Sequence, residues 1–163
     1  DSNYVESITK NKLRNLTRGE IGCFLSHKKT YNKLLDSHED YCLILEDDVE
    51  LCDNFVNEIN NCLSQLNRFD IFYCYHYTPL QFYNSIGKDV KDYFPEKWDK
   101  NLPLLLDKDY SKDCVLSGHK TGTYGMIISK KAAKQLLNNM PTIKCKIDVQ
   151  MHFKDVKKDL KLF

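Results

Sequence analysis

Hydrophobic positions along the chain follow helical spacing first and strand-like spacing next. After Thr17, apolar side chains recur three and four residues apart, which predicts an amphipathic helix from about residue 18 to residue 36. Thr17 and Glu20 have the spacing of a capping box, in which each side chain accepts a hydrogen bond from the other residue's backbone N–H. The apolar run at residues 41–45 (YCLIL) then predicts a strand that is buried on both faces, as in a parallel sheet.

The middle of the chain predicts a second helix, a second strand and a long loop. Apolar side chains at positions 56, 59, 63 and 66 share one helical face, and Asp53 can cap the helix that they predict. Residues 70–75 (DIFYCY) are rich in β-forming side chains and predict a strand. Residues 77–113 contain three prolines and no sustained period, so we expect a long loop of functional importance.

The last third of the chain returns to regular patterns. Residues 122–128 (GTYGMII) predict a strand, Ser129 can cap the helix that follows it, and Pro141 ends that helix. An amphipathic segment begins at Asp148, and residues 160–163 could form one more strand. Because helix and strand patterns alternate along the chain, the sequence predicts an α/β layer fold.

Composition and charge narrow the class of protein. The 163 residues suit one domain spanning residues 1–163, and 42% hydrophobic with 29% charged residues is ordinary globular usage. Lys and Arg total 24 against 23 Asp and Glu, which argues against a nucleic-acid partner. No apolar run approaches the ~20 residues of a membrane span. The basic residues between positions 154 and 161 would still allow peripheral contact with a membrane surface.

Cysteine usage indicates a reducing compartment. The chain has seven cysteines, and none of them forms a Cys-x-x-Cys pair or a Cys-His pair at zinc-site spacing. An odd number favours free thiols, which predicts a cytoplasmic protein. A bridge between Cys52 and Cys62 is the alternative for a secreted form.

Three consecutive carboxylates, Glu46, Asp47 and Asp48, directly follow the predicted strand at 41–45. Like charges this close repel one another unless a cation neutralises them, and oxygen ligands suit Mg²⁺ or Mn²⁺. Such a cation suits a nucleotide diphosphate in turn. A strand that runs into an acidic surface turn is the alternative explanation.

Three segments together resemble a known enzyme family. They are residues 16–27 (LTRGEIGCFLSH), 43–49 (LILEDDV) and 122–132 (GTYGMIISKKA). In this order and at these separations they resemble glycosyltransferase family 25, the lipooligosaccharide and procollagen galactosyltransferase family. The resemblance extends over roughly residues 13–160.

The resemblance implies a fold and an activity. It implies a GT-A-like, Rossmann-type sandwich and transfer of a hexose, with galactose expected, from a UDP-sugar to a sugar or hydroxylysine acceptor, with inversion and with Mn²⁺ or Mg²⁺. The family's N-terminal strand precedes the first of the three segments, so we expect this single glycosyltransferase domain to lack that strand and to be a fragment. A non-catalytic domain that binds a glycan or a partner protein is the alternative, and a eukaryotic source would place the protein in the endoplasmic reticulum lumen.

The resemblance also implies roles for individual residues at the acidic triplet and near the C-terminus. Asp48 is expected to bind the metal directly, with Glu46 or Asp47 contacting metal, water or ribose. Asp148 is the expected catalytic base, and an ordinary helix N-cap is its alternative. His152 lies four residues further on and could share a helix face with Asp148 in a metal or phosphate site, or could simply pack.

Donor contacts are expected from the other two segments. Ser26 and His27 end the first segment and are expected to contact nucleotide or sugar, although His27 could instead be a packing residue. Glu20 could bind the donor or serve only as the capping-box acid. Gly122 and Thr123 could bring backbone close to the sugar, or could form the turn that starts a strand.

Overall fold

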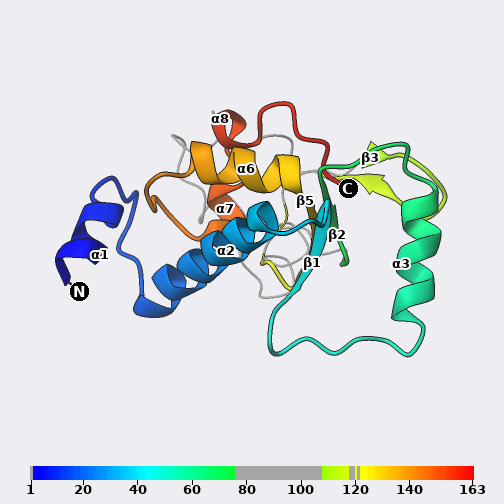
Figure 1. Ribbon diagram of the computed structural model, residues 1–163, viewed down its shortest axis with the longest axis horizontal. Helices are drawn as coiled ribbons and strands as arrows, with labels where there is room; N and C mark the ends of the chain where they lie inside the picture. The colour runs from blue at the N-terminus through cyan, green and yellow to red at the C-terminus, as the bar shows by residue number, and fades with distance from the viewer. Residues whose placement is uncertain (1, 76–107, 118–119, 121) are drawn as a thin grey trace, which may run out of the picture.

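The computed structural model describes residues 2–75, 108–117, 120 and 122–163, and its elements confirm a mixed α/β fold (Figure 1). The helices are α1 (Ser2–Thr9), α2 (Arg18–Asp36), α3 (Phe55–Ser64), α6 (Lys130–Asn139), α7 (Ile147–Gln150) and α8 (Lys154–Lys157). The strands are β1 (Tyr41–Leu45), β2 (Ile71–Tyr73), β3 (Lys108–Asp109), β4 (Val115–Leu116) and β5 (Gly125–Ser129).

The main sheet has the order β1-β5-β2, and β5 runs antiparallel to both neighbours. In the register, Leu45 of β1 and Tyr73 of β2 lie opposite Gly125 and Met126 at the start of β5. Because both outer strands oppose β5, they run in the same direction, and their carboxyl ends lie at the edge where β5 begins. Residues that follow β1 and residues that precede β5 therefore meet at one edge of the sheet.

Helices cover the sheet on both faces, and each face has its own apolar cluster. On one face α2 and α6 lie side by side, and Phe24, Tyr31 and Leu136 are fully buried there (Figure 1). On the other face α3 packs against a smaller cluster that contains Phe72 and Phe163. Burial of each such side chain contributes roughly 1.5–3 kcal/mol, so the larger cluster supplies most of the stability.

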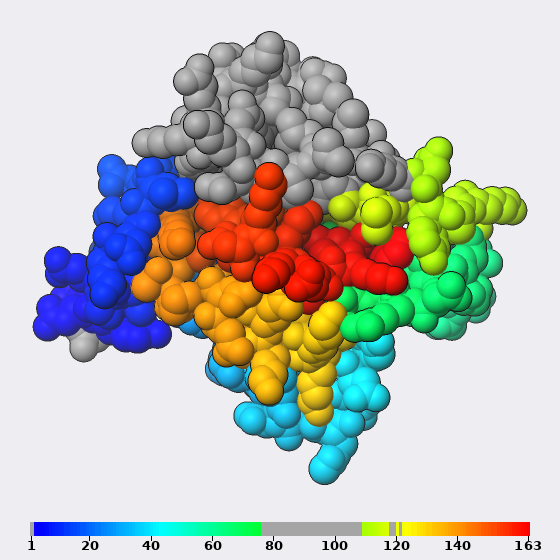
Figure 2. Space-filling view, turned by 90° about the horizontal axis from the view of Figure 1, so that it is seen from above, coloured from blue at the N-terminus to red at the C-terminus, as the bar shows by residue number. Residues whose placement is uncertain are grey.

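The C-terminal segments pack across the middle of the molecule. Figure 2 shows the orange and red residues of α6, α7, α8 and the C-terminus between the blue N-terminal residues and the green α3 region. Residues 160–163 were expected to form a further strand. Instead, Leu162 forms an isolated parallel bridge with Ile71. The amphipathic segment expected from Asp148 is divided into two short helices, α7 and α8.

Both strong helix-start predictions are confirmed. Thr17 Oγ1 accepts a hydrogen bond from the Glu20 N–H at 3.2 Å, and Glu20 Oε2 accepts one from the Thr17 N–H at 2.9 Å. At α6 the Ser129 hydroxyl oxygen accepts from the Ala132 N–H at 3.1 Å, and the helix ends at Asn139, before Pro141.

Two expectations about the first half are wrong. The strand β1 is not buried on both faces: Cys42 and Ile44 pack against the larger cluster, whereas Tyr41, Leu43 and Leu45 alternate with them and are 37–45% exposed. The sheet is antiparallel in its pairing, so its strand pattern differs from that of a parallel core. Helix α3 has Asn54 at its N-cap instead of Asp53 and no side-chain cap.

The remaining predictions concern the cysteines, the long loop and the lack of a membrane span. All seven cysteines are free thiols, so the alternative bridge between Cys52 and Cys62 is not formed. Residues 76–107 of the expected loop lie outside the described residues, and within 108–116 the strands β3 and β4 pair antiparallel. Among the helices that the structure describes, none is long and apolar enough to cross a membrane.

The capping box should contribute measurably to stability. Thr17→Ala removes the side-chain acceptor at the N-cap, so we expect a loss of about 1 kcal/mol in the free energy of unfolding. For a chain of this size that corresponds to a fall in melting temperature of about 2–4 °C. Thr30→Ala, in the interior of the same helix, is the control; an equal loss in both variants would contradict a specific capping effect.

Candidate active site

A cavity of about 280 Å³ lies at the edge of the sheet where β1 ends and β5 begins. The first turns of α2 form one wall, and the start of α7 forms another. Four carboxylates and one lysine face it from three separate parts of the chain. The lining residues are Gly19, Glu20, Cys23, Glu46, Asp48, Gly122, Thr123, Tyr124, Lys146, Ile147 and Asp148.

Glu46 is fixed at the junction of the sheet and α2. Its backbone N–H donates to the Tyr124 carbonyl at 3.1 Å, which continues the β1–β5 pairing one residue beyond β1. The Thr123 hydroxyl donates to Glu46 Oε1, and His27 Nε2 lies 3.9 Å from the same oxygen. One carboxylate therefore connects residues from all three of the predicted sequence segments.

Gly122 brings backbone into the site in a conformation that favours glycine. Its φ is +84°, and a Cβ built there would lie 2.6 Å from the Tyr124 ring. Its N–H donates to Asp148 Oδ2 at 2.8 Å, and its carbonyl accepts from the Tyr75 hydroxyl at 2.7 Å. The positive φ is thus the reason for glycine here.

Asp148 is a nearly buried carboxylate, with 8% of the residue exposed. Besides the bond from Gly122, its Oδ1 accepts from the Val149 N–H at 3.0 Å. Burial raises the pKa of this carboxyl, and the bond from Gly122 acts in the opposite direction. The alternative of an ordinary N-cap is wrong, since Lys146 is the N-cap of α7 and Asp148 is inside the helix.

His27 is a buried packing residue that contacts Glu46, and it is not among the residues that line the cavity. It is buried on α2, where the Tyr31 hydroxyl lies 3.3 Å from Nδ1 while Nε2 points to Glu46. Burial lowers the pKa of the imidazole, and the Glu46 carboxylate raises it. Ser26 is exposed, one position around the helix, and is not among the residues that line the cavity.

Glu20 is confirmed as the capping-box acid, and its place in the cavity leaves its predicted donor contact a prediction. It caps α2 and also lines the cavity, where Arg14 Nη2 lies 2.6 Å and Lys146 Nζ 3.8 Å from Glu20 Oε1. The hydrogen bond from Arg14 is the main cause that lowers the pKa of Glu20 to about 2. This carboxylate therefore remains ionised at neutral pH.

Of the other residues that were predicted to bind metal, one lines the cavity and two do not. Asp48 is exposed at the mouth of the cavity, whereas Asp47 is exposed outside the lining. His152 is fully buried beyond the end of α7, with Nε2 3.0 Å from the Tyr73 hydroxyl, and it does not line the cavity. The expected helix face shared by Asp148 and His152 is not formed, because α7 ends at Gln150.

Sequence reasoning missed two polar residues of the site. Cys23 is three residues after Glu20 and four before His27, so helical spacing could have placed it on the same face. Its thiol pKa is raised by burial and by the Glu46 and Asp148 carboxylates. Lys146 had no comparable signal, because it reaches the cavity from the irregular segment between α6 and α7.

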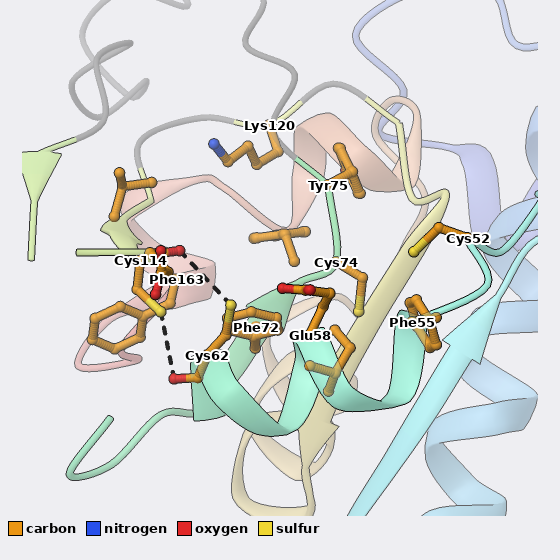
Figure 3. Close-up of a pocket in the computed structure, with 14 residues that line it drawn as sticks. Cys52, Phe55, Glu58, Cys62, Phe72, Cys74, Tyr75, Cys114, Lys120 and Phe163 are labelled. Atoms are coloured by element: carbon orange, nitrogen blue, oxygen red, sulfur yellow. Dashed lines mark hydrogen bonds between the residues drawn. The ribbon is translucent and has the colours of Figure 1, made fainter. Parts of the chain in front are cut away.

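A second cavity, of about 330 Å³, lies on the α3 face of the sheet and is mostly apolar (Figure 3). Phe55 and Cys62 of α3 face Phe72 and Cys74 across it. Tyr75 also lines this cavity while its hydroxyl bonds to Gly122 in the first one. The second cavity contains none of the residues that were predicted for the site.

Comparison with known sequences identifies the family. Residues 2–151 match the family described as glycosyltransferase family 25 (LPS biosynthesis protein). The chain belongs to glycosyltransferase family 25. The resemblance inferred from the three sequence segments is thereby confirmed.

Related members of family 25 come from animals and bacteria. The chain is 30% identical to human procollagen galactosyltransferase 2 over 128 residues, which is 78% of this chain and 18% of that protein. It is 33% identical over 135 residues to the lipooligosaccharide biosynthesis protein lex-1 of Haemophilus influenzae, or 79% of this chain and 40% of that protein. The lipooligosaccharide biosynthesis protein lic2B is 30% identical over 139 residues, 83% of this chain and 47% of that protein. The chain thus spans less than half the length of each of these relatives.

The Glu20 interactions should make stability depend on pH in acid. A folded-state pKa of about 2, below the ordinary 4.5, means that ionised Glu20 stabilises the fold fully above pH 4.5. That contribution is lost as the pH falls from 4.5 through about 2. We expect the difference in unfolding free energy between the unaltered protein and Glu20→Gln, measured by denaturant titration, to shrink over this range. Glu39→Gln controls for loss of one negative charge, and a difference that stays constant down to pH 2 would contradict the assignment.

Proposed function

We propose that this family 25 chain forms the donor and catalytic region of a glycosyltransferase that moves a hexose from a UDP-sugar to an acceptor hydroxyl. One observation carries the proposal: Glu46, Asp48, Gly122 and Asp148, which were selected from the sequence for donor, metal and base roles, line one cavity. Family membership makes sugar transfer the reaction class that this cavity fits best. The GT-A-like fold is part of this proposal and rests on membership of family 25.

The carboxylates at the end of β1 suit a divalent cation. Asp48 is exposed at the cavity and Glu46 lies deeper, so two hard oxygen ligands could hold Mn²⁺ or Mg²⁺ while water and phosphate complete the coordination. When bound, such an ion acts as a Lewis acid on the departing diphosphate. His152 is buried against Tyr73 and fits this site less well than the two carboxylates.

Other residues of the cavity suit the remaining parts of the donor. Lys146 is an exposed cation at the cavity wall and could contact the diphosphate. Gly122 and Thr123 offer backbone and hydroxyl groups close to where the sugar would lie. His27 reaches this region through Glu46, so it would position that carboxylate.

Asp148 is the best candidate for the base in a single displacement. The acceptor oxygen would form a bond to the anomeric carbon of the donor sugar while the bond from that carbon to the diphosphate breaks. The electron pair of the broken bond leaves with UDP, and the acceptor hydroxyl proton passes to Asp148. Attack opposite the leaving group gives inversion. The raised pKa of Asp148 strengthens it as a proton acceptor relative to an ordinary aspartate.

Galactose is the sugar that we propose, with a glycan sugar or hydroxylysine as acceptor. The names of the animal relatives specify procollagen galactosyltransferases, and those of the bacterial relatives specify lipooligosaccharide biosynthesis. A non-catalytic domain that binds a glycan or a partner is the competing function, since the chain spans only part of each relative.

The metal and donor proposal predicts a coupled thermal response. UDP-galactose together with Mn²⁺ at about 100 times the dissociation constant should stabilise the protein by about 2.7 kcal/mol. That is a rise in melting temperature of about 5–10 °C. Asp48→Asn should abolish the rise, because it removes a charged ligand.

Asp53→Asn is the matched control, since Asp53 is exposed five residues further on and does not line the cavity. UDP-glucose in place of UDP-galactose tests the choice of sugar. An unchanged melting temperature with both ligands, or a full response in Asp48→Asn, would overturn the assignment of donor and metal to this cavity.

The base proposal predicts loss of turnover without loss of donor binding. Asp148→Asn should lower kcat for sugar transfer by about 10²–10⁴-fold while the Mn²⁺-dependent thermal response to UDP-galactose persists. Asp155→Asn, an exposed aspartate on α8, should leave both unchanged. Donor binding by the unaltered protein without any transfer would favour the non-catalytic alternative instead.

A further inference from the structure

A cysteine, a histidine and a glutamate converge where α2 meets the end of β1, and two of them, Cys23 and Glu46, line the cavity. One ligand atom from each of Cys23, His27 and Glu46 lies within 4.8 Å of the other two. Cys23 and His27 are four residues apart on α2 and so share a helix face, and Glu46 reaches them from the end of β1. Within the described part of the chain, these three residues form a group of side chains whose potential ligand atoms are close enough to share one metal ion.

The mixture of sulfur, nitrogen and oxygen selects a particular class of cation. Mg²⁺ and Mn²⁺ prefer oxygen ligands, whereas Zn²⁺ accepts thiolate, imidazole and carboxylate together. With bonds of about 2.0–2.3 Å in tetrahedral geometry, the ligand atoms of a zinc site lie about 3.3–3.7 Å apart. His27 Nε2 and Glu46 Oε1 are 3.9 Å apart, and all three ligand atoms lie within 4.8 Å of one another, so small side-chain adjustments would bring them to these separations.

The surroundings orient these ligands as a metal site requires. The Tyr31 hydroxyl lies 3.3 Å from His27 Nδ1, which leaves Nε2 directed at Glu46. The Thr123 hydroxyl donates to the Glu46 carboxylate and fixes its direction. Such partners hold the first ligands in place in metalloproteins. Cys23 and Glu46 also line the cavity, so a fourth coordination position would open into it.

We propose that Cys23, His27 and Glu46 bind one Zn²⁺ ion, with the fourth position open to the cavity. This inference goes beyond the proposed sugar transfer and does not rest on that function. The two proposed cation sites share Glu46, but the donor-linked cation would use Asp48 as its second ligand, whereas Zn²⁺ would use Cys23 and His27. Its test measures metal binding alone.

Cobalt titration tests the site directly. Reduced, metal-free protein is titrated with Co²⁺, a coloured substitute for Zn²⁺, and absorbance from thiolate-to-cobalt charge transfer is followed. We expect the absorbance to saturate at one equivalent and to disappear when one equivalent of Zn²⁺ is added. Cys23→Ser should remove the charge-transfer absorbance, and His27→Gln should weaken binding by at least about 10-fold.

Two further variants keep the result interpretable. Glu46→Gln leaves the α2 core intact and keeps an acceptor for the Thr123 hydroxyl, so it should fold while binding Co²⁺ at least about 10-fold more weakly. Cys52→Ser removes an exposed thiol elsewhere and should change neither stoichiometry nor affinity. The proposal is overturned if the unaltered protein gives no charge-transfer absorbance, if that absorbance survives in Cys23→Ser, or if Glu46→Gln binds with unchanged affinity.

Discussion

The antiparallel pairing of β1 with β5 is the constraint on which the rest of the site depends. The pairing extends past the last residue of β1 through the bond from the Glu46 N–H to the Tyr124 carbonyl. It therefore sets the segments that contain Glu46 and Tyr124, 78 residues apart in sequence, against each other at their polar ends. A slip of one residue would turn the Glu46 side chain to the opposite face, away from His27 and Thr123. The burial of Met126 and Ile128 on the α2 face resists such a slip, so packing in the core fixes the geometry of the cavity.

Carboxylates in the cavity differ in chemistry because their surroundings differ. Glu20 is held ionised by Arg14, whereas Asp148 is nearly buried and receives two backbone N–H groups. Environments that move the pKa values of two acids apart give those acids separate roles, one as a permanent charge and one as a proton acceptor. The hydrogen bond between Gly122 and Asp148 also couples the proposed base to the segment proposed to lie beside the sugar. A change at Gly122 would consequently disturb both, since its φ of +84° is strained for any other residue.

The sequence predicted correctly features that depend on residues close together in the chain, such as the starts of α2 and α6. The start of α2 could be predicted because Thr17 and Glu20 satisfy each other's backbone within one turn, and Ser129 acts in the same way at α6. The exposure of β1 could not be predicted, because an apolar run does not reveal which neighbour covers it. The three family segments contain five of the residues that were predicted for the site and that line the cavity: Glu20, Glu46, Asp48, Gly122 and Thr123. Lys146 was missed because its position depends on how an irregular segment returns to the sheet, a long-range feature without a sequence period.

Glu46 is the residue at which the two proposed cation sites meet. Its carboxylate faces His27 and Thr123 on one side and the cavity that contains Asp48 on the other. If Glu46 bound a zinc ion beside Cys23, its carboxylate would be a weaker ligand for Mn²⁺ or Mg²⁺ at Asp48. If it bound Mn²⁺ or Mg²⁺ instead, it would be a weaker ligand for zinc. Thiolate and imidazole favour the softer ion, whereas diphosphate oxygens from a donor favour the harder one. The occupant of the cavity would then depend on whether donor is present, so the same carboxylate could couple metal identity to substrate binding.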